Sequence, residues 1–363
     1  MTDISNTRNK KHSWIDVIRT IGAFFIILIH VSDTYLDLFK SIDLVNWISV
    51  VFWNSIPRSG VPLFIAVSGY VLLEKDDEIG KRIYNLLTPL AFWSLFYFLL
   101  ALALSAKSNP DFVKQLFIKS LLGISAFAPH LWFLYMLLGL YISLPLSRLL
   151  FRHLDAKGTA MLCFACASNS LIYHMTSVWN LVTGEQVQSF YSWGLGWGNI
   201  YFGYFLLPKL IIDKKYFKIK NTHLWIAVIV STLFVFSLTF ATSLKLGYFT
   251  KIWEDPPSVF ILIQTFSIIL LLSRSENTIQ KVFNRFITLR KIVEISSRHA
   301  LGIYAIHYFF VKLIFYAIDR STWQQQSHNF ILILIILISI SVWLLSLLVS
   351  ISASKNNFLR RVF

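Results

Sequence analysis

Ten apolar runs, each about 20 residues long, divide this chain and constrain its fold more than any other feature. A run of this length crosses the hydrocarbon core of a bilayer as an α-helix. The sequence therefore predicts an all-α, polytopic integral membrane protein, a single domain over residues 1–363 with about ten transmembrane helices around a central cavity. The predicted spans cover roughly 14–35, 56–73, 84–105, 131–150, 159–176, 193–212, 223–244, 257–273, 299–318 and 329–352. The fifth is the weakest, and residues 42–55 are predicted to form an interfacial helix that leads into the second.

Composition excludes soluble and disordered proteins. Hydrophobic residues make up 56% of the chain and charged residues 14%, whereas soluble domains carry about a quarter charged residues. The net charge of +15 lies in short clusters between apolar runs, which is typical of membrane topology, so no nucleic-acid partner is expected. The first run contains Asp16 and Arg19 and is not followed by a small-residue cleavage site, so it is not a cleavable signal peptide.

The distribution of lysine and arginine predicts the orientation of the chain. If the N-terminus faces the cytoplasm, the cytoplasmic segments hold 23 of the 33 basic residues and the opposite side holds seven. Cytoplasmic loops carry the excess of lysine and arginine. Both termini are therefore expected in the cytoplasm, with residues 1–13 and 353–363 as cytoplasmic tails.

The first span carries three ionisable residues on one face. Arg19 and His30 are 11 residues apart, which leaves an angular offset of about 20° and a separation of roughly 16 Å along a helix axis. Asp16, three residues before Arg19, shares that face and is able to pair with it. Asp16 and Arg19 alone could instead form an interfacial ion pair, with the arginine snorkelling to the membrane surface. His30 alone could instead make a hydrogen bond between helices. The alignment of all three favours a polar passage, because ionisable groups inside spans are costly and usually face a cavity.

Further polar side chains occur at membrane depth in other spans. Tyr304 and His307 are three residues apart and share a helix face, although interhelical packing explains them equally well. His130 begins the fourth span, and Arg58 and Ser68 bracket the second.

Metal binding is not predicted from these residues. Three histidines on three spans invite a zinc site, but no HxxxH or HExxH spacing occurs, and His130 is expected near the outer surface. Cys163 and Cys166 form a CxxC pair in an apolar run without a second pair, so packing is the better interpretation.

Aromatic residues crowd the predicted outer loops, around the start of the sixth span. Sugar rings stack on such side chains, and an interfacial aromatic belt is the alternative interpretation. Glu185 in the same loop is a candidate ligand for a sugar hydroxyl, although a solvated loop residue is the plainer interpretation. The aromatic residues are Trp179, Phe190, Tyr191, Trp193 and Trp197.

Four motifs together resemble the membrane-bound acyltransferase family 3. WIDVIRTIGAFFIILIH is similar to the family's opening, an arginine, ten intervening residues and a histidine, which Arg19 and His30 match, while Asp16 matches its aspartate-x-x-arginine start. VPLFIAVSGYVL resembles the second-span motif, HLWFL the fourth-span motif and SRHALGIYAIH the late motif. Order and spacing agree over nearly the whole chain. The nearest subgroup is the WecH-like inner-membrane O-acetyltransferases of surface glycans.

The resemblance implies transfer of acetyl from cytoplasmic acetyl-CoA to a hydroxyl of a surface glycan or its lipid-linked precursor, in a bacterial inner membrane. It makes His30 the general base or a covalent acyl relay. Asp16 and Arg19 are further catalytic candidates, and His307 and Tyr304 are candidates to orient the acceptor or stabilise an oxyanion. The residues expected to bind the donor are Arg19, Lys81, Arg82, Arg58 and Ser68. Those expected to contact the acceptor are His130, Trp132, Glu185 and Trp193.

Several points stay open at this level. Many relatives carry a second arginine three residues after the one matched by Arg82, but Asn85 stands there in this chain, which puts the donor contacts in question. Membrane lipid is an expected partner, and a homo-oligomer is left open. A transporter or flippase that moves a glycolipid or acyl donor without chemistry is the alternative function.

Overall fold

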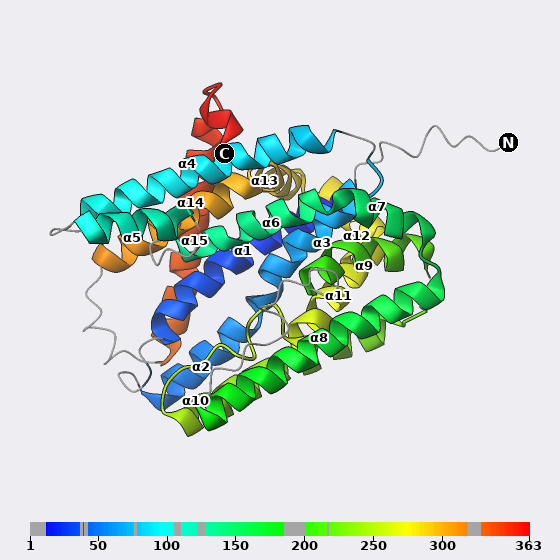
Figure 1. Ribbon diagram of the computed structural model, residues 1–363, viewed down its shortest axis with the longest axis horizontal. Helices are drawn as coiled ribbons and strands as arrows, with labels where there is room; N and C mark the ends of the chain where they lie inside the picture. Colours follow the sequence, from blue (N-terminus) through cyan, green and yellow to red (C-terminus); the bar gives the residue numbers. More distant parts are fainter. Residues whose placement is uncertain are drawn as a thin grey trace.

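The computed structural model describes residues 12–36, 39, 43–75, 78–104, 110–121, 128–184, 200–215, 218–317 and 328–363. Within these residues all regular structure is helical, and the helices form a bundle around α1 (Figure 1). The all-α, polytopic prediction is therefore confirmed. The elements are α1 (Ser13–Leu36), α2 (Leu44–Ser55), η2 (Pro57–Ser59), α3 (Gly60–Leu72), α4 (Ile79–Leu104), α5 (Pro110–Leu121), η3 (Pro129–Leu131), α6 (Trp132–Ile142), α7 (Leu144–His153), α8 (Ala156–Thr183), α9 (Ile200–Lys214), α10 (Asn221–Leu246), α11 (Val259–Arg274), α12 (Glu276–Arg285), α13 (Ile287–Arg298), α14 (Ala300–Ala317), α15 (His328–Ala353) and η6 (Leu359–Arg361).

Helices occur at all ten predicted runs, but fewer of them are long and apolar enough to cross a membrane as one piece. Six candidate spans are found in the described residues, or up to eight if two bent helix pairs each count as one span. One pair, α6 and α7, bends by 58° and the other, α11 and α12, by 63°. Neither α8, where the weakest run was predicted, nor α9 is among these candidates.

The expected interfacial helix at 42–55 is instead packed into the bundle. α2 continues through η2 into α3, and together they form one candidate span, Leu44–Leu72, in which 72% of the most apolar 18-residue stretch is buried. Trp47, Val50 and Val51 are almost fully buried against α1 and its neighbours. Pro57 lies at the first position of η2, where its missing N–H breaks the regular hydrogen bonding between the two helices.

The α3–α9 crossing depends on a residue without a side chain. A Cβ added at Gly69 would overlap the backbone carbonyl of Phe205 on α9, so the two helix backbones approach as closely as glycine permits. α9 is almost wholly buried, and Cys166 of α8 packs against its Gly203. Both cysteines are free, with Cys166 buried.

We expect Gly69→Ala to destabilise the protein by about 1–3 kcal/mol or more, because the backbone contact leaves no flexible side chain to move. The matched control is Gly80→Ala on α4, where a Cβ meets nothing within 4 Å. Thermal unfolding in detergent, followed by size-exclusion chromatography, measures both. Equal melting temperatures for the two variants would contradict this account of the crossing.

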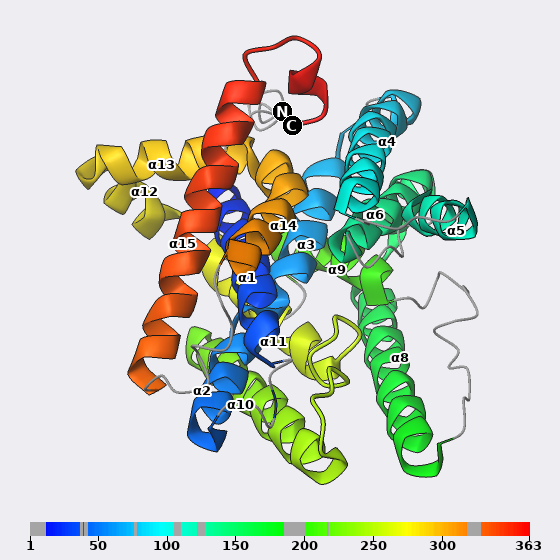
Figure 2. The same ribbon diagram turned by 90° about the vertical axis from the view of Figure 1, so that its left-hand side faces the viewer.

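The two ends of the described chain lie on one side of the molecule. α1 begins and α15 ends there, and α12 and α13 lie across the same side (Figure 2). The Ser297 hydroxyl of α13 donates to the Asp16 carboxylate of α1 at 2.6 Å and holds the two helices together. Arg19 therefore lies toward this side of the bundle, and His30 lies farther along α1.

Candidate active site

Three histidines from three separate elements meet in the interior. The ring centroids of His30 on α1 and His307 on α14 are 5.3 Å apart, and His130 on η3 lies 5.0 Å from His307 and 6.3 Å from His30. We call these residues the histidine cluster. His130 is 2% exposed and His307 is fully buried. The expectation of a surface position for His130 is therefore wrong, because η3 turns its ring inward.

Hydrogen bonds within the protein define the proton positions on two of these rings. His307 Nδ1 lies 2.5 Å from the carbonyl oxygen of Tyr304, and His130 Nε2 lies 3.2 Å from that of Ala305. A carbonyl oxygen only accepts, so each of these nitrogens carries the proton in the neutral ring. The opposite nitrogens, His307 Nε2 and His130 Nδ1, are buried and have no hydrogen-bond partner in the described part of the chain. Two lone pairs are thus available to accept a proton beside His30.

Tyrosines surround the histidine cluster and position it. The Tyr304 hydroxyl donates to the backbone carbonyl of His130, so its proton is used within the protein and Tyr304 positions His130. The Tyr97 hydroxyl donates at 2.9 Å to the same Ala305 carbonyl that His130 faces. The ring of Tyr308 lies 5.2 Å from those of both His30 and His130.

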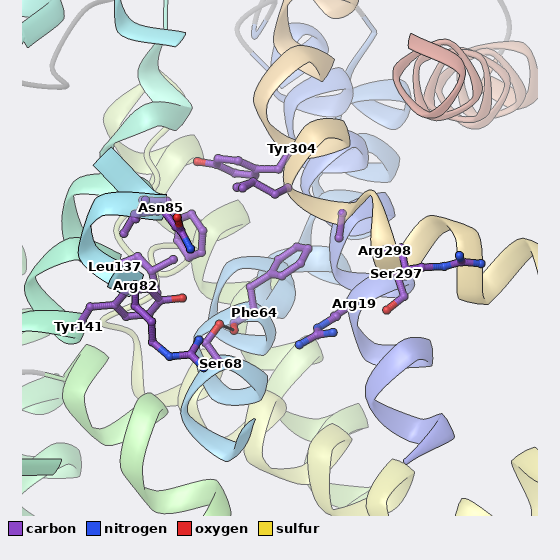
Figure 3. A pocket seen from close by; sticks show the side chains of 14 residues that line it. Arg19, Phe64, Ser68, Arg82, Asn85, Leu137, Tyr141, Ser297, Arg298 and Tyr304 are labelled. Atoms are coloured by element: carbon purple, nitrogen blue, oxygen red, sulfur yellow. Dashed lines mark hydrogen bonds between the residues drawn. The ribbon is translucent and has the colours of Figure 1, made fainter. Parts of the chain in front are cut away.

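A cationic cavity of about 340 Å³ leads up to Tyr304. We call it the central cavity. Figure 3 shows Arg19 and Arg82 extending from α1 and α4 toward Ser68 on α3, while Arg298 points away. The polar residues that line the central cavity include Arg19, Ser68, Arg82, Asn85, Ser297 and Tyr304.

α1 is one continuous helix, so Arg19 and His30 keep the predicted angular offset, but His30 itself does not line the central cavity. Arg19 lines the central cavity, and His30 contacts His307, which lies one turn beyond the cavity residue Tyr304. Asp16 is buried, accepts the Ser297 hydrogen bond and interacts electrostatically with Arg19. Because Arg19 faces a cavity between helices, the alternative of a snorkelling interfacial arginine does not describe it.

Other predicted site residues lie elsewhere. Lys81 lines a neighbouring cavity, and Trp132 packs with its ring centroid 5.6 Å from that of Tyr201. Arg58 does not line the central cavity, so its predicted role in donor binding finds no support in its position. Glu185 and Trp193 lie outside the described residues.

Arg58 instead belongs to an ion cluster beyond His30, which we call the Arg58 cluster. Arg58 Nη2 lies 2.9 Å from Asp33 Oδ1 and 2.5 Å from Glu254 Oε2. Lys251 Nζ lies 2.8 Å from Asp33 Oδ2, and the Asn54 amide donates to Asp33 Oδ1 at 3.0 Å. Asp33, Arg58 and Lys251 all interact electrostatically with His30.

Sequence reasoning missed most of this group. Asp33 follows His30 by three residues, so helical spacing was enough to place both on one face. Glu254 gave no such signal, since it comes from the loop before α11, about two hundred residues from its partner Arg58.

Glu254 is expected to make stability depend on pH. Burial, together with the nearby Asp33 carboxylate, raises the pKa of Glu254 to about 7 from an ordinary 4.5, although Arg58 opposes this shift. The folded state therefore keeps a proton that the unfolded chain releases at lower pH, and stability falls as pH rises from about 4.5 to about 7. Between about pH 5 and pH 8, the melting temperature in detergent should fall by several degrees for the wild type and by less for Glu254→Gln. Parallel profiles of melting temperature against pH for the two proteins would contradict this role of Glu254.

The fold and the central cavity together define a multi-pass membrane protein with a buried, cationic polar site beside a histidine cluster. Among the described residues, no group of three histidine, cysteine, aspartate or glutamate side chains is arranged to hold a metal ion. A family model described as an acyltransferase domain matches residues 12–350. The protein therefore belongs to the membrane-bound acyltransferase family 3, and it is a membrane acyltransferase. Neither the curated proteins nor the solved structures include a match.

Proposed function

We propose that this acyltransferase moves an acetyl group from cytoplasmic acetyl-CoA to a hydroxyl of a cell-surface glycan or its lipid-linked precursor, in a bacterial inner membrane. One observation carries the proposal: a cavity with two converging arginines ends, at Tyr304, beside a histidine cluster in which His307 and His130 each offer an unprotonated nitrogen. An anionic donor needs the arginines, and a poorly nucleophilic hydroxyl needs an imidazole to remove its proton.

The arginine end of the central cavity suits the donor. CoA carries several phosphate charges, and guanidinium groups bind phosphate oxygens through charge-assisted, often paired hydrogen bonds. Arg19 and Arg82 supply two such groups, and the bias of lysine and arginine assigns this end to the cytoplasm, where CoA is found. The thin pantetheine arm then extends along the cavity toward Tyr304 and presents the thioester to the histidine cluster.

At the histidine cluster, transfer requires that the acceptor hydroxyl lose its proton as its oxygen attacks the thioester carbonyl. The tetrahedral intermediate then collapses, the carbon–sulfur bond breaks, and CoA leaves as the thiol. His30 is the proposed base, supported by its position between the cavity and the Arg58 cluster. His307 and His130, whose ring centroids lie 5.3 Å and 6.3 Å from that of His30, are the proposed proton relay through their unpartnered nitrogens.

A covalent route is the second form of the same proposal. His30 would attack the thioester, hold the acetyl group on a ring nitrogen and pass it to the acceptor. An experiment without acceptor distinguishes the two routes. Labelled acetyl-CoA leaves a labelled protein only if an acyl-histidine forms.

The experiment that tests the function uses purified protein in detergent with labelled acetyl-CoA and glycan extracted from cells that lack the protein. The expected result is labelled O-acetyl glycan, with mass spectrometry of surface glycans from cells with and without the protein identifying the acceptor. Transport without chemistry predicts the opposite result, namely no CoA binding and no label transfer, with accumulation of substrate in vesicles.

A further inference from the structure

The segment after α15 is folded against α4. The indole N–H of Trp93 on α4 donates to the Val362 carbonyl at 2.9 Å, and the rings of Trp93 and Phe363 lie 5.0 Å apart. Val362 is fully buried. Asn356 accepts hydrogen bonds from the backbone of Phe358 and Leu359, which starts the η6 turn. The chain end therefore has a defined position on the bundle.

This docking builds a second basic cavity, of about 510 Å³, which we call the tail pocket. Two of its cations come from η6, Arg360 and Arg361, and the third is Lys81 on α4. No carboxylate lines it, and none of the three cations forms an ion pair with another described residue. Three positive side chains that face one cavity, with no carboxylate beside them in the described part of the chain, repel one another, so the site favours a ligand with negative charge.

Asn85 connects the tail pocket with the central cavity. It lines both, on the turn of α4 that follows Lys81 and Arg82. Since Asn85 is uncharged, the positive charge around it comes from Lys81, Arg82 and the two tail arginines. A ligand that lies across Asn85 thus has cations on both sides.

We propose that the tail pocket binds a phosphate monoester, the 3′-phosphate at the nucleotide end of the same donor, with Arg360 and Arg361 as its ligands. The inference rests on the proposed function. The diphosphate lies between Arg82 and Arg19, the pantetheine arm enters the central cavity, and the nucleotide crosses Asn85. Arginine suits a terminal phosphate because its planar group donates two parallel hydrogen bonds.

The test compares CoA with 3′-dephospho-CoA by titration calorimetry in detergent at fixed salt concentration. The wild type is expected to bind CoA about tenfold more tightly than 3′-dephospho-CoA. In Arg360→Gln/Arg361→Gln this preference is lost through weaker CoA binding, while the affinity for 3′-dephospho-CoA is unchanged. Lys355→Gln is the matched control, since Lys355 is an exposed cation of the same segment that lines neither cavity.

The outcomes separate this inference from the proposed function. If the wild type binds neither nucleotide, the donor assignment itself fails. If it binds CoA and the double variant keeps the full preference for the 3′-phosphate, only the tail-pocket inference is overturned. Native mass spectrometry measures whether anionic phospholipid co-purifies with the protein. If the double variant loses this phospholipid while its CoA binding is unchanged, the tail-pocket inference is also overturned and the site belongs to a lipid headgroup.

Discussion

His30→Ala is expected to abolish acetyl transfer and to leave the fold and CoA binding intact. Removal of a general base costs about 10²–10⁴-fold in rate, and removal of a covalent relay costs more. His30 is half-buried at the meeting point of α1, η3 and α14, and its truncation removes no hydrogen bond that holds these elements together. Initial rates with labelled acetyl-CoA, together with melting temperature and CoA affinity, provide the measurement.

A histidine outside the cluster supplies the control for this variant. His174 on α8 is also buried, and its Nε2 lies 3.1 Å from the Ser258 hydroxyl, away from the other three imidazoles. His174→Gln should keep nearly full activity. If His30→Ala retains activity, His30 has no catalytic role, and His307, with its unpartnered Nε2, becomes the residue to test next.

Arg19→Ala is expected to weaken CoA binding by about ten- to a hundredfold, the loss associated with one or two hydrogen bonds to a charged group. The guanidinium of Arg19 points into the central cavity, whereas that of Arg298, on the rim of the same cavity, points away from it (Figure 3). Arg298→Ala is therefore the matched control. The difference in CoA affinity between the wild type and Arg19→Ala should decrease as salt is added, because mobile ions screen the attraction between arginine and phosphate.

Unfolding measurements must accompany the Arg19 experiment, because Asp16 loses an electrostatic partner in the variant. The bond from Ser297 to Asp16 remains and keeps α1 against α13. Equal CoA affinities for wild type and Arg19→Ala, at low salt and with unchanged melting temperature, would show that the donor phosphates bind elsewhere.

The sequence predicted the helical content well because each apolar run needs a helix to satisfy its backbone in lipid. Apolar length does not predict bends in this way. The break between α6 and α7 coincides with Pro145 in the first turn of α7, which is a local signal, whereas the burial of α2 depends on neighbours that are distant in sequence. Apolar length alone does not distinguish a straight span from a bent or interior one.

The candidate site was predictable where a single helix defines it. Helical spacing placed Arg19 and His30 on one face, and the same rule, applied once more, would have included Asp33. Contacts between distant segments were not accessible, as the pairing of Arg58 with Glu254 and the inward turn of His130 show. Residues 353–363 were interpreted as a tail for the same reason, since their attachment depends on Trp93 of α4.

Above about pH 7, where Glu254 is ionised, the Arg58 cluster sets two cations, Arg58 and Lys251, against two carboxylates, Asp33 and Glu254, and so compensates its own charge. Among the described residues, no carboxylate lines the central cavity or the tail pocket. α1 thus carries two electrostatic environments, an electropositive one around Arg19 and a nearly neutral one around Asp33. An anionic reactant would be attracted to the Arg19 end of the helix, with no moving part required.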